Sequence, residues 1–263
     1  MLKGIAAALT VWGILASPAV GQSLFDGSWK VNLNSVEQAP HPEVIILRKG
    51  VFTCRSCDHP FHLRADGKFH KVQGQDGFDT ASVRVTGARS FVRTNRLKTR
   101  VVRVETRTLA PDGKSATLTF TDTINEGIAP VSGKQTLMRT APGPAGAHAL
   151  SGTWVHQTAT EVSENALIQT FLIKDDTLTM TTGEGFSYTA RLDGTPARAS
   201  GDPLVDTVSV TVRGDRQIEE VDSGKGGIIA RYTYSLSADG VTLTITLREE
   251  KTGKVSTMTA GKQ

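Results

Sequence analysis

The amino-acid sequence predicts an all-β fold built of two tandem antiparallel meander β-barrels that arose by internal duplication. The first observation behind this prediction is a long-range repeat, in which Gly27-Ser28-Trp29 recurs as Gly152-Thr153-Trp154 and the segment 79–83 recurs as 206–210. Motifs that recur in one order at near-constant spacing indicate a duplicated folding unit of domain size. The other two observations are an alternation of apolar and polar residues and a series of tight-turn dipeptides.

Apolar and polar residues alternate over short segments in both repeats. These segments include 83–85, 102–104, 117–121, 178–182, 208–212 and 241–247. An alternation with a period of two is typical of a strand with one buried and one wet face. Pairs of Asp and Gly, typical of hairpin turns, separate the segments at positions 66, 76, 112, 193, 214 and 239. Short strands joined by tight turns favour an antiparallel meander, and closure into a barrel removes its unpaired edges.

Residues 1–21 have the pattern of a secretory signal peptide. Lys3 gives a positive start, an apolar run covers 5–16, and Ala19-Val20-Gly21 offers small residues ahead of a cleavage site before Gln22. We therefore expect a periplasmic or secreted protein with no transmembrane segment after signal cleavage.

The remainder of the chain is predicted to form two domains. The expected first barrel covers 22–140 and the expected second barrel covers 149–263. Between them, residues 141–148 have no periodicity and contain two prolines, so we expect a linker there.

Each repeat starts with a Gly-x-Trp motif, formed by Gly27 and Trp29 in the first and by Gly152 and Trp154 in the second. A glycine lets the backbone bend as the strand enters, and a buried indole can close one end of a small barrel. In this motif the chain resembles the lipocalin-like, calycin-type barrels. The resemblance implies that both tryptophans are barrel-closing structural residues. Lipocalins usually pair this tryptophan with an arginine near the last strand, a role that Arg139 fits in the first repeat, whereas 257–260 contains no arginine.

The layout is also similar to that of a group of uncharacterised exported bacterial proteins with two tandem lipocalin-like repeats. The shared features are an opening like 25–30, a Cys-x-x-Cys motif and a linker like 143–148. This likeness implies no particular activity.

Cys54 and Cys57 are the two cysteines of the chain. In an exported protein this spacing favours a local disulfide. One alternative is a metal site made by both cysteines with His59 and His62, because four soft or borderline ligands within nine residues suit zinc or copper. A thiol-redox role is a further alternative, although residues 51–52 precede Cys54 as a strand would, and a reactive cysteine prefers a helix N-terminus.

Positive charge is concentrated in the first half of the chain, between positions 84 and 107. Arg93, Arg96, Lys98 and Arg100 form a candidate anion-binding ribbon for phosphate, sulfated glycan or lipid head groups. The alternative is a plain solvated strand face. Phe91 is the one aromatic residue in this stretch, so we do not expect a nucleic-acid partner.

The sequence predicts a binding protein more than an enzyme. It has no nucleophile elbow or phosphate loop, so we assign no catalytic residue and expect no cofactor. The leading hypothesis is an exported non-enzymatic protein that binds a small apolar or amphipathic molecule, or an envelope partner. The alternatives are the metal or thiol-redox protein described above and a structural or interaction module of the cell envelope. The sequence leaves the oligomeric state open.

Overall fold

A computed structural model describes residues 23–38, 40, 42–57, 59–75 and 77–263. The signal peptide predicted for residues 1–21 lies outside the described residues. The structure confirms the predicted all-β class: antiparallel strands form one closed and one nearly closed barrel, joined in tandem. Among the described residues, two short 3-10 helices interrupt the strands, η1 (Leu33–Ser35) and η2 (Glu164–Leu167). Within the described part of the chain, no helix is long and apolar enough to cross a membrane.

The first barrel is a ten-stranded sheet with the order β5-β4-β3-β12-β11-β10-β9-β8-β7-β6. Its strands are β3 (Pro42–Arg48), β4 (Val51–Cys54), β5 (Phe61–Arg64), β6 (His70–Lys71), β7 (Thr80–Gly87), β8 (Ser90–Leu97), β9 (Arg100–Leu109), β10 (Ser115–Asp122), β11 (Val131–Pro142) and β12 (Gly152–Val162).

The second barrel is closed, because β1 pairs with β13 on one side and with β21 on the other. Its strands are β1 (Gly27–Val31), β13 (Ile168–Lys174), β14 (Thr177–Thr182), β15 (Ser187–Arg191), β16 (Ala197–Ser200), β17 (Thr207–Val212), β18 (Gln217–Gly224), β19 (Gly227–Leu236), β20 (Thr242–Glu249) and β21 (Val255–Lys262). The short strand β2 (Glu37–Gln38) adds to β21 outside this circle.

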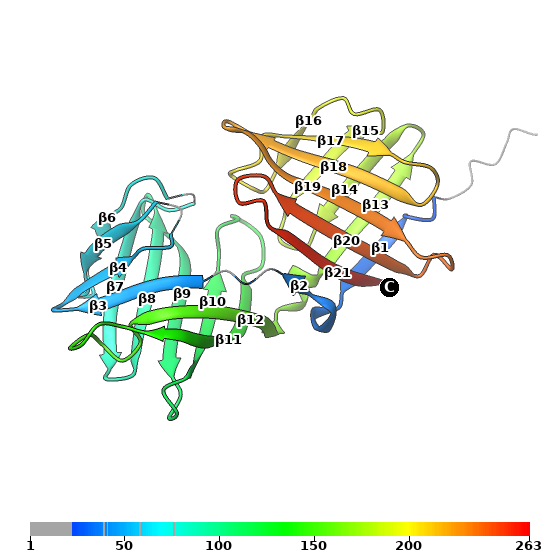
Figure 1. Cartoon of the computed structure of the whole chain (residues 1–263). Coiled ribbons are helices and arrows are strands. Elements are labelled where there is room, and N and C mark those ends of the chain that lie inside the picture. The colour runs from blue at the N-terminus through cyan, green and yellow to red at the C-terminus, as the bar shows by residue number, and fades with distance from the viewer. Residues whose placement is uncertain (1–22, 39, 41, 58, 76) are drawn as a thin grey trace, which may run out of the picture.

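The two repeats exchange their first strands. β1 belongs to the first repeat but lies in the second barrel, and β12 belongs to the second repeat but lies between β11 and β3 of the first barrel. Figure 1 shows blue β1 among the yellow-to-red strands and green β12 beside β11. The two barrels are therefore joined by two crossing segments, one between β2 and β3 and one between β12 and β13.

This strand order differs from the predicted division into 22–140, a linker at 141–148, and 149–263. Residues 141 and 142 still belong to β11, and residues 143–151 turn that strand directly into its antiparallel neighbour β12. A short connection keeps successive strands adjacent. The equivalent first strands of two repeats carry the same Gly-x-Trp motif, so the sequence does not tell which copy each barrel takes.

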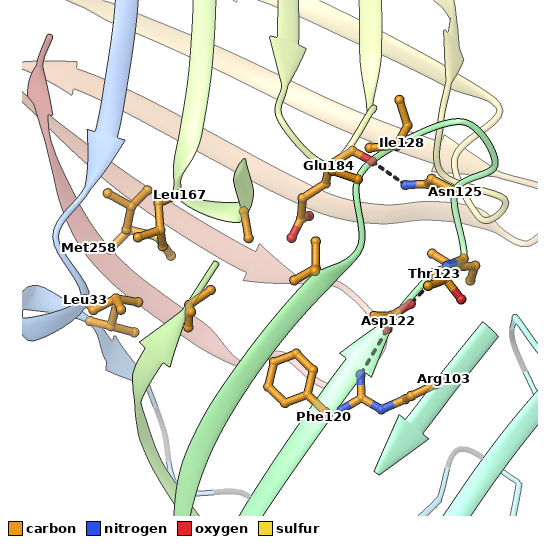
Figure 2. Close-up of a pocket in the computed structure, with 17 residues that line it drawn as sticks. Leu33, Arg103, Phe120, Asp122, Thr123, Asn125, Ile128, Leu167, Glu184 and Met258 are labelled. Atoms are coloured by element: carbon orange, nitrogen blue, oxygen red, sulfur yellow. Dashed lines mark hydrogen bonds and ion pairs between the residues drawn. The ribbon is translucent and has the colours of Figure 1, made fainter. Parts of the chain in front are cut away.

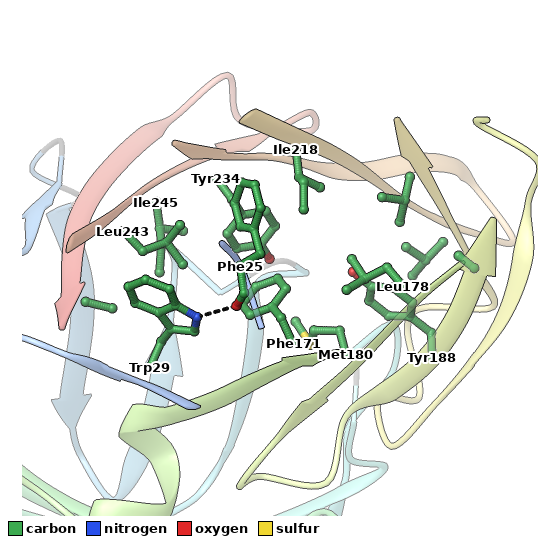
Figure 3. Packing of buried hydrophobic residues seen from close by; sticks show 14 of the residues in the cluster. Phe25, Trp29, Phe171, Leu178, Met180, Tyr188, Ile218, Tyr234, Leu243 and Ile245 are labelled. Atoms are coloured by element: carbon green, nitrogen blue, oxygen red, sulfur yellow. Dashed lines mark hydrogen bonds between the residues drawn. The ribbon is translucent and has the colours of Figure 1, made fainter. Parts of the chain in front are cut away.

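The two tryptophans occupy equivalent, fully buried places in the two barrels. Trp29 Nε1 donates to the Phe25 carbonyl oxygen at 2.8 Å, as Figure 3 shows, and Trp154 Nε1 donates to the Leu150 carbonyl oxygen at 2.9 Å. A cation covers each indole, but Arg139 lies over Trp154 and not over Trp29 of its own repeat. Lys262, at the end of β21, takes the corresponding place over Trp29. The strand exchange accounts for both pairings.

Candidate functional site

The predicted disulfide pair lies at the end of β4. Cys54 Sγ and Cys57 Sγ are 2.04 Å apart, at the distance of a disulfide bond. His59 and His62 are both exposed, and Phe61 and Leu63 take the inward positions of β5 on either side of His62. Among the described residues, no group of three or more His, Cys, Asp or Glu side chains is placed to hold a metal ion.

The four basic residues predicted to bind an anion do not share one exposed face. Arg93 points into the first barrel, where its side chain is 12% exposed and pairs with Glu105. Arg96 stacks on the ring of Phe69. Arg100 donates to the carbonyl oxygens of residues 123 and 124, and Lys98 is exposed at the turn between β8 and β9.

The interior of the first barrel contains a network of ion pairs beside its hydrophobic core. Arg107, 2% exposed, donates to both oxygens of Glu43, with a 2.8 Å bond from Nη2, and also pairs with Glu105. Arg93 Nη2 lies 2.8 Å from Glu105 Oε2, and His156 Nε2 lies 3.1 Å from Glu43 Oε2. Each buried acid in this interior therefore has an arginine partner.

These arginines control the ionisation of the acids beside them. Burial by itself would raise the pKa of Glu105, but the charges of Arg107 and Arg93 lower that pKa to about 2. The pKa of Glu43 is held well below its usual range, because Arg107 and a hydrogen bond with His156 outweigh the effect of burial. Both carboxylates therefore stay charged at neutral pH, and the network stays neutralised from within.

The second barrel has different side chains at the same interior positions. The strand register identifies the equivalent sites: Arg93 pairs with Val83 and Glu105 across the sheet, just as Glu220 pairs with Val210 and Tyr232. The corresponding substitutions, from first to second barrel, are Glu43 to Gln169, Arg93 to Glu220, Asn95 to Asp222, Glu105 to Tyr232 and Arg107 to Tyr234. Both interior arginines are thus replaced by groups that carry no positive charge.

Two buried carboxyl groups on β18 dominate the interior of the second barrel. Glu220 is 1% exposed and accepts a hydrogen bond from the hydroxyl of Tyr188. Asp222 is 4% exposed, and its Oδ1 has no hydrogen-bond partner among the described residues. Burial raises the pKa of Asp222 to about 6, and burial together with Asp222 raises the pKa of Glu220 well above its ordinary value.

The two carboxyl groups face a cavity of about 210 Å³ inside the second barrel. Its polar lining also includes Gln169, which is 9% exposed and whose Nε2 finds no acceptor in the described part of the chain. Apolar and aromatic side chains complete the wall. Among them are Met180, Phe186, Tyr232, Tyr234 and Ile245. The cavity therefore combines a polar base with apolar walls.

A second pocket, of about 430 Å³, lies between the two barrels (Figure 2). It shares Val31, Glu184 and Met258 with the interior cavity, so the two spaces meet at these side chains. The wider pocket is lined mainly by apolar side chains, and its polar lining includes Glu184 and the ion pair of Arg103 with Asp122. The strand exchange brings its two sides together: Leu33 and Val36 lie between β1 and β2, and Leu167 lies between β12 and β13. The apolar lining includes Leu33, Val36, Phe120, Ile128, Val162 and Leu167.

The loop between β10 and β11 lines this pocket and contacts the second barrel. Asn125 Nδ2 donates to the carbonyl oxygen of Glu184 at 2.6 Å, and Ile128 packs near the same turn between β14 and β15 (Figure 2). Burial raises the pKa of Glu184, with a further contribution from Asp122. A molecule inside the second barrel would therefore pass an opening that residues of both barrels form.

Sequence reasoning did not identify the interior acids as a site. The signal is present in β18, where 218, 220 and 222 should all be apolar if one strand face packs in a core. Only Ile218 satisfies that pattern. A carboxyl group at two inward positions of one strand is unusual enough to mark a site, because charged side chains are seldom buried without partners.

No protein-family model, curated protein or solved structure matches this chain. The structure confirms the coarser part of the lipocalin-like resemblance, namely an all-β fold with two barrels.

Proposed function

We propose that this protein binds a small amphipathic molecule inside the second barrel. The polar end of the molecule lies against Asp222 and Gln169, and its apolar part extends past Met258 into the pocket between the barrels. The observation that carries the proposal is the pair of buried polar atoms, Asp222 Oδ1 and Gln169 Nε2, that line a cavity without hydrogen-bond partners in the described structure.

The two barrel interiors differ in charge and in how their buried polar groups are partnered. A buried polar group without a partner costs about 1–3 kcal/mol, a penalty that a bound molecule removes by supplying the partner. In the first barrel the position of Gln169 is taken by Glu43, which pairs with Arg107 and His156. The position of Asp222 is taken by Asn95, whose Oδ1 also has no hydrogen-bond partner among the described residues, but Asn95 is uncharged and lines none of the described cavities. We therefore assign the ligand to the second barrel and a supporting role to the first.

The proposed protein is a lipocalin-like carrier or receptor, exported to the periplasm or the medium, and binding is its role in place of catalysis. Support comes from the form of the site: one polar end, an apolar approach and a barrel that surrounds the ligand, which is the usual design of a small-molecule site in a β-barrel. The opening at the junction of the barrels gives both of them a part in ligand entry.

The experiment is a titration with N-phenyl-1-naphthylamine, a neutral fluorophore that brightens in apolar sites. We expect saturable binding of one probe per chain, and Met258→Trp should abolish it by filling the point where the two spaces meet. The matched control is Met138→Trp, because Met138 is exposed on the first barrel and lines neither space. Absence of saturable binding, or equal binding by both variants, would contradict the proposal.

A further inference from the structure

We infer that the molecule bound in the second barrel is an organic cation, with an ammonium group at the two carboxyl groups of β18 and an apolar body in the opening. This inference rests on the proposed function and specifies its ligand class. Its starting point is the difference in charge between two interiors that share one fold.

Among the described residues, the lining of the interior cavity carries acidic groups without basic ones. Four acidic side chains line the interior cavity, and among the described residues that line it there is no Lys, Arg or His. The four acids are Glu184, Asp202, Glu220 and Asp222. The first barrel instead balances Glu43 and Glu105 with Arg93 and Arg107. The second barrel instead has carboxyl groups at the positions of Arg93 and Asn95, and no positively charged side chain among the described residues that line its cavity.

The fold does not require these acids. Asn95 occupies in the first barrel the place that Asp222 occupies in the second, so a neutral side chain of the same shape fits this position. A buried carboxylate without a counter-charge is costly, and the cost is removed either by a proton or by a bound cation. A ligand ammonium group supplies three N–H donors, and Asp222 Oδ1 is a free acceptor within the described structure.

The site suits an organic cation better than a metal ion. The described acids are not grouped so that three of them could hold one metal. Tyr232, which lines the cavity, instead lies in a stack with Tyr234, with ring centroids 6.0 Å apart and ring planes within 6° of parallel. Aromatic faces attract organic cations. The apolar opening next to this site, which includes Leu33 and Ile128, suits a hydrocarbon body that a bare metal ion does not have.

The test compares three probes that share one chain and differ in charge: octylamine, 1-octanol and octanoate. Isothermal titration of the whole protein at pH 7.5 should show that octylamine binds about tenfold or more tightly than 1-octanol, because hydrogen bonds to charged groups are stronger than neutral ones. Octanoate should bind most weakly of the three. Magnesium or calcium chloride at millimolar concentration should not compete with octylamine.

The variants assign the preference to the two carboxyl groups. Glu220→Gln combined with Asp222→Asn should remove the preference, so that octylamine and 1-octanol bind the double variant with the same affinity. The matched control is Glu219→Gln, since Glu219 lies on the opposite face of the same strand and pairs with the exposed Arg213. If the double variant does not fold, the same titrations use Asp222→Asn alone. This single change introduces the side chain that the first barrel already has at the equivalent position, Asn95.

The possible outcomes distinguish failure of the cation inference from failure of the proposed binding function. Equal affinity for octylamine and 1-octanol, or tighter binding of octanoate, would overturn the cation inference and leave the proposed binding function standing. An amine preference that survives in the folded double variant would also overturn it. Failure of all three probes to bind would contradict the proposed function itself.

Discussion

The first barrel should depend strongly on Arg107, and Arg107→Met is the sharpest test of its ion-pair network. The substitution removes the two hydrogen bonds to Glu43 and the pairing with Glu105, and it leaves a side chain of similar length in a place that is 2% exposed. Among the described residues, Glu105 would then keep Arg93 and the more distant Arg103 as partners, and Glu43 would keep His156. Removing one member of a buried ion pair costs about 3–5 kcal/mol. That is a large share of the about 5–15 kcal/mol that stabilises a typical domain.

The assay is urea unfolding at pH 7 in a Trp29→Phe background, where the fluorescence of Trp154 reports on the first barrel. The matched control is Lys134→Met on the same barrel, where Lys134 pairs with Glu161 at an exposed site, so its loss should cost less than about 1 kcal/mol.

The free energy of unfolding measured as a function of pH tests the same ion-pair network in a second way. The pKa of Glu105 is lowered in the folded state to about 2, so its stabilisation is present above its ordinary pKa of 4.5 and is lost as the pH falls toward about 2. Arg107→Met removes much of that effect, so wild type and variant should converge as the pH falls. The reasoning is refuted if Arg107→Met stays within about 1 kcal/mol of wild type at pH 7, the range of an exposed pair.

Three further predictions concern the other features of the structure. The pKa of Asp222 is raised to about 6, so the contribution of Asp222 to stability is present below its ordinary pKa of 3.8 and is lost as the pH rises through about 6. Unfolding of the second barrel, followed by the fluorescence of Trp29, should show this loss of stability with rising pH, and Asp222→Asn should abolish the pH dependence. Alkylation of the oxidised protein should find no free thiol at Cys54 or Cys57. Replacing both cysteines with serine should lower the free energy of unfolding by less than the about 3 kcal/mol expected for a 15-residue loop. A larger loss of stability would contradict a purely local role for the disulfide. A fragment of residues 42–162 contains every strand of the first barrel and should unfold more cooperatively by circular dichroism than a fragment of residues 22–140, which lacks β12; the reverse order would contradict the strand exchange.

The sequence was sufficient for the fold class because its signals are local and repeated. Alternation in segments such as 117–121 and 241–247 corresponds to β10 and β20, and the spacing of Cys54 and Cys57 placed their sulfurs together. The strand exchange could not be predicted in this way. Either copy of the Gly-x-Trp strand offers the same buried indole and the same hydrogen bond to a carbonyl four residues earlier, so the choice depends on the length and path of the connections.

The candidate site escaped prediction for a different reason. Charged residues on a strand are expected to face water, so the sequence groups Arg93 with its basic neighbours in an exposed ribbon. The side chains of Arg93 and of Glu220 in the second repeat point into the barrels. The strand period does place them on the inward face, but the cost of burying a charge argues against that placement until its partners are known. Those partners come from strands distant in the sequence, such as Glu43 for Arg107.

The most direct test of the central claim is a crystal structure of the protein with bound octylamine. The account predicts one amine in the second barrel, with its nitrogen within hydrogen-bond distance of Asp222 Oδ1 and its chain directed past Met258 toward Leu33 and Ile128. An amine bound elsewhere, or one whose nitrogen points away from the carboxyl groups of β18, would contradict it.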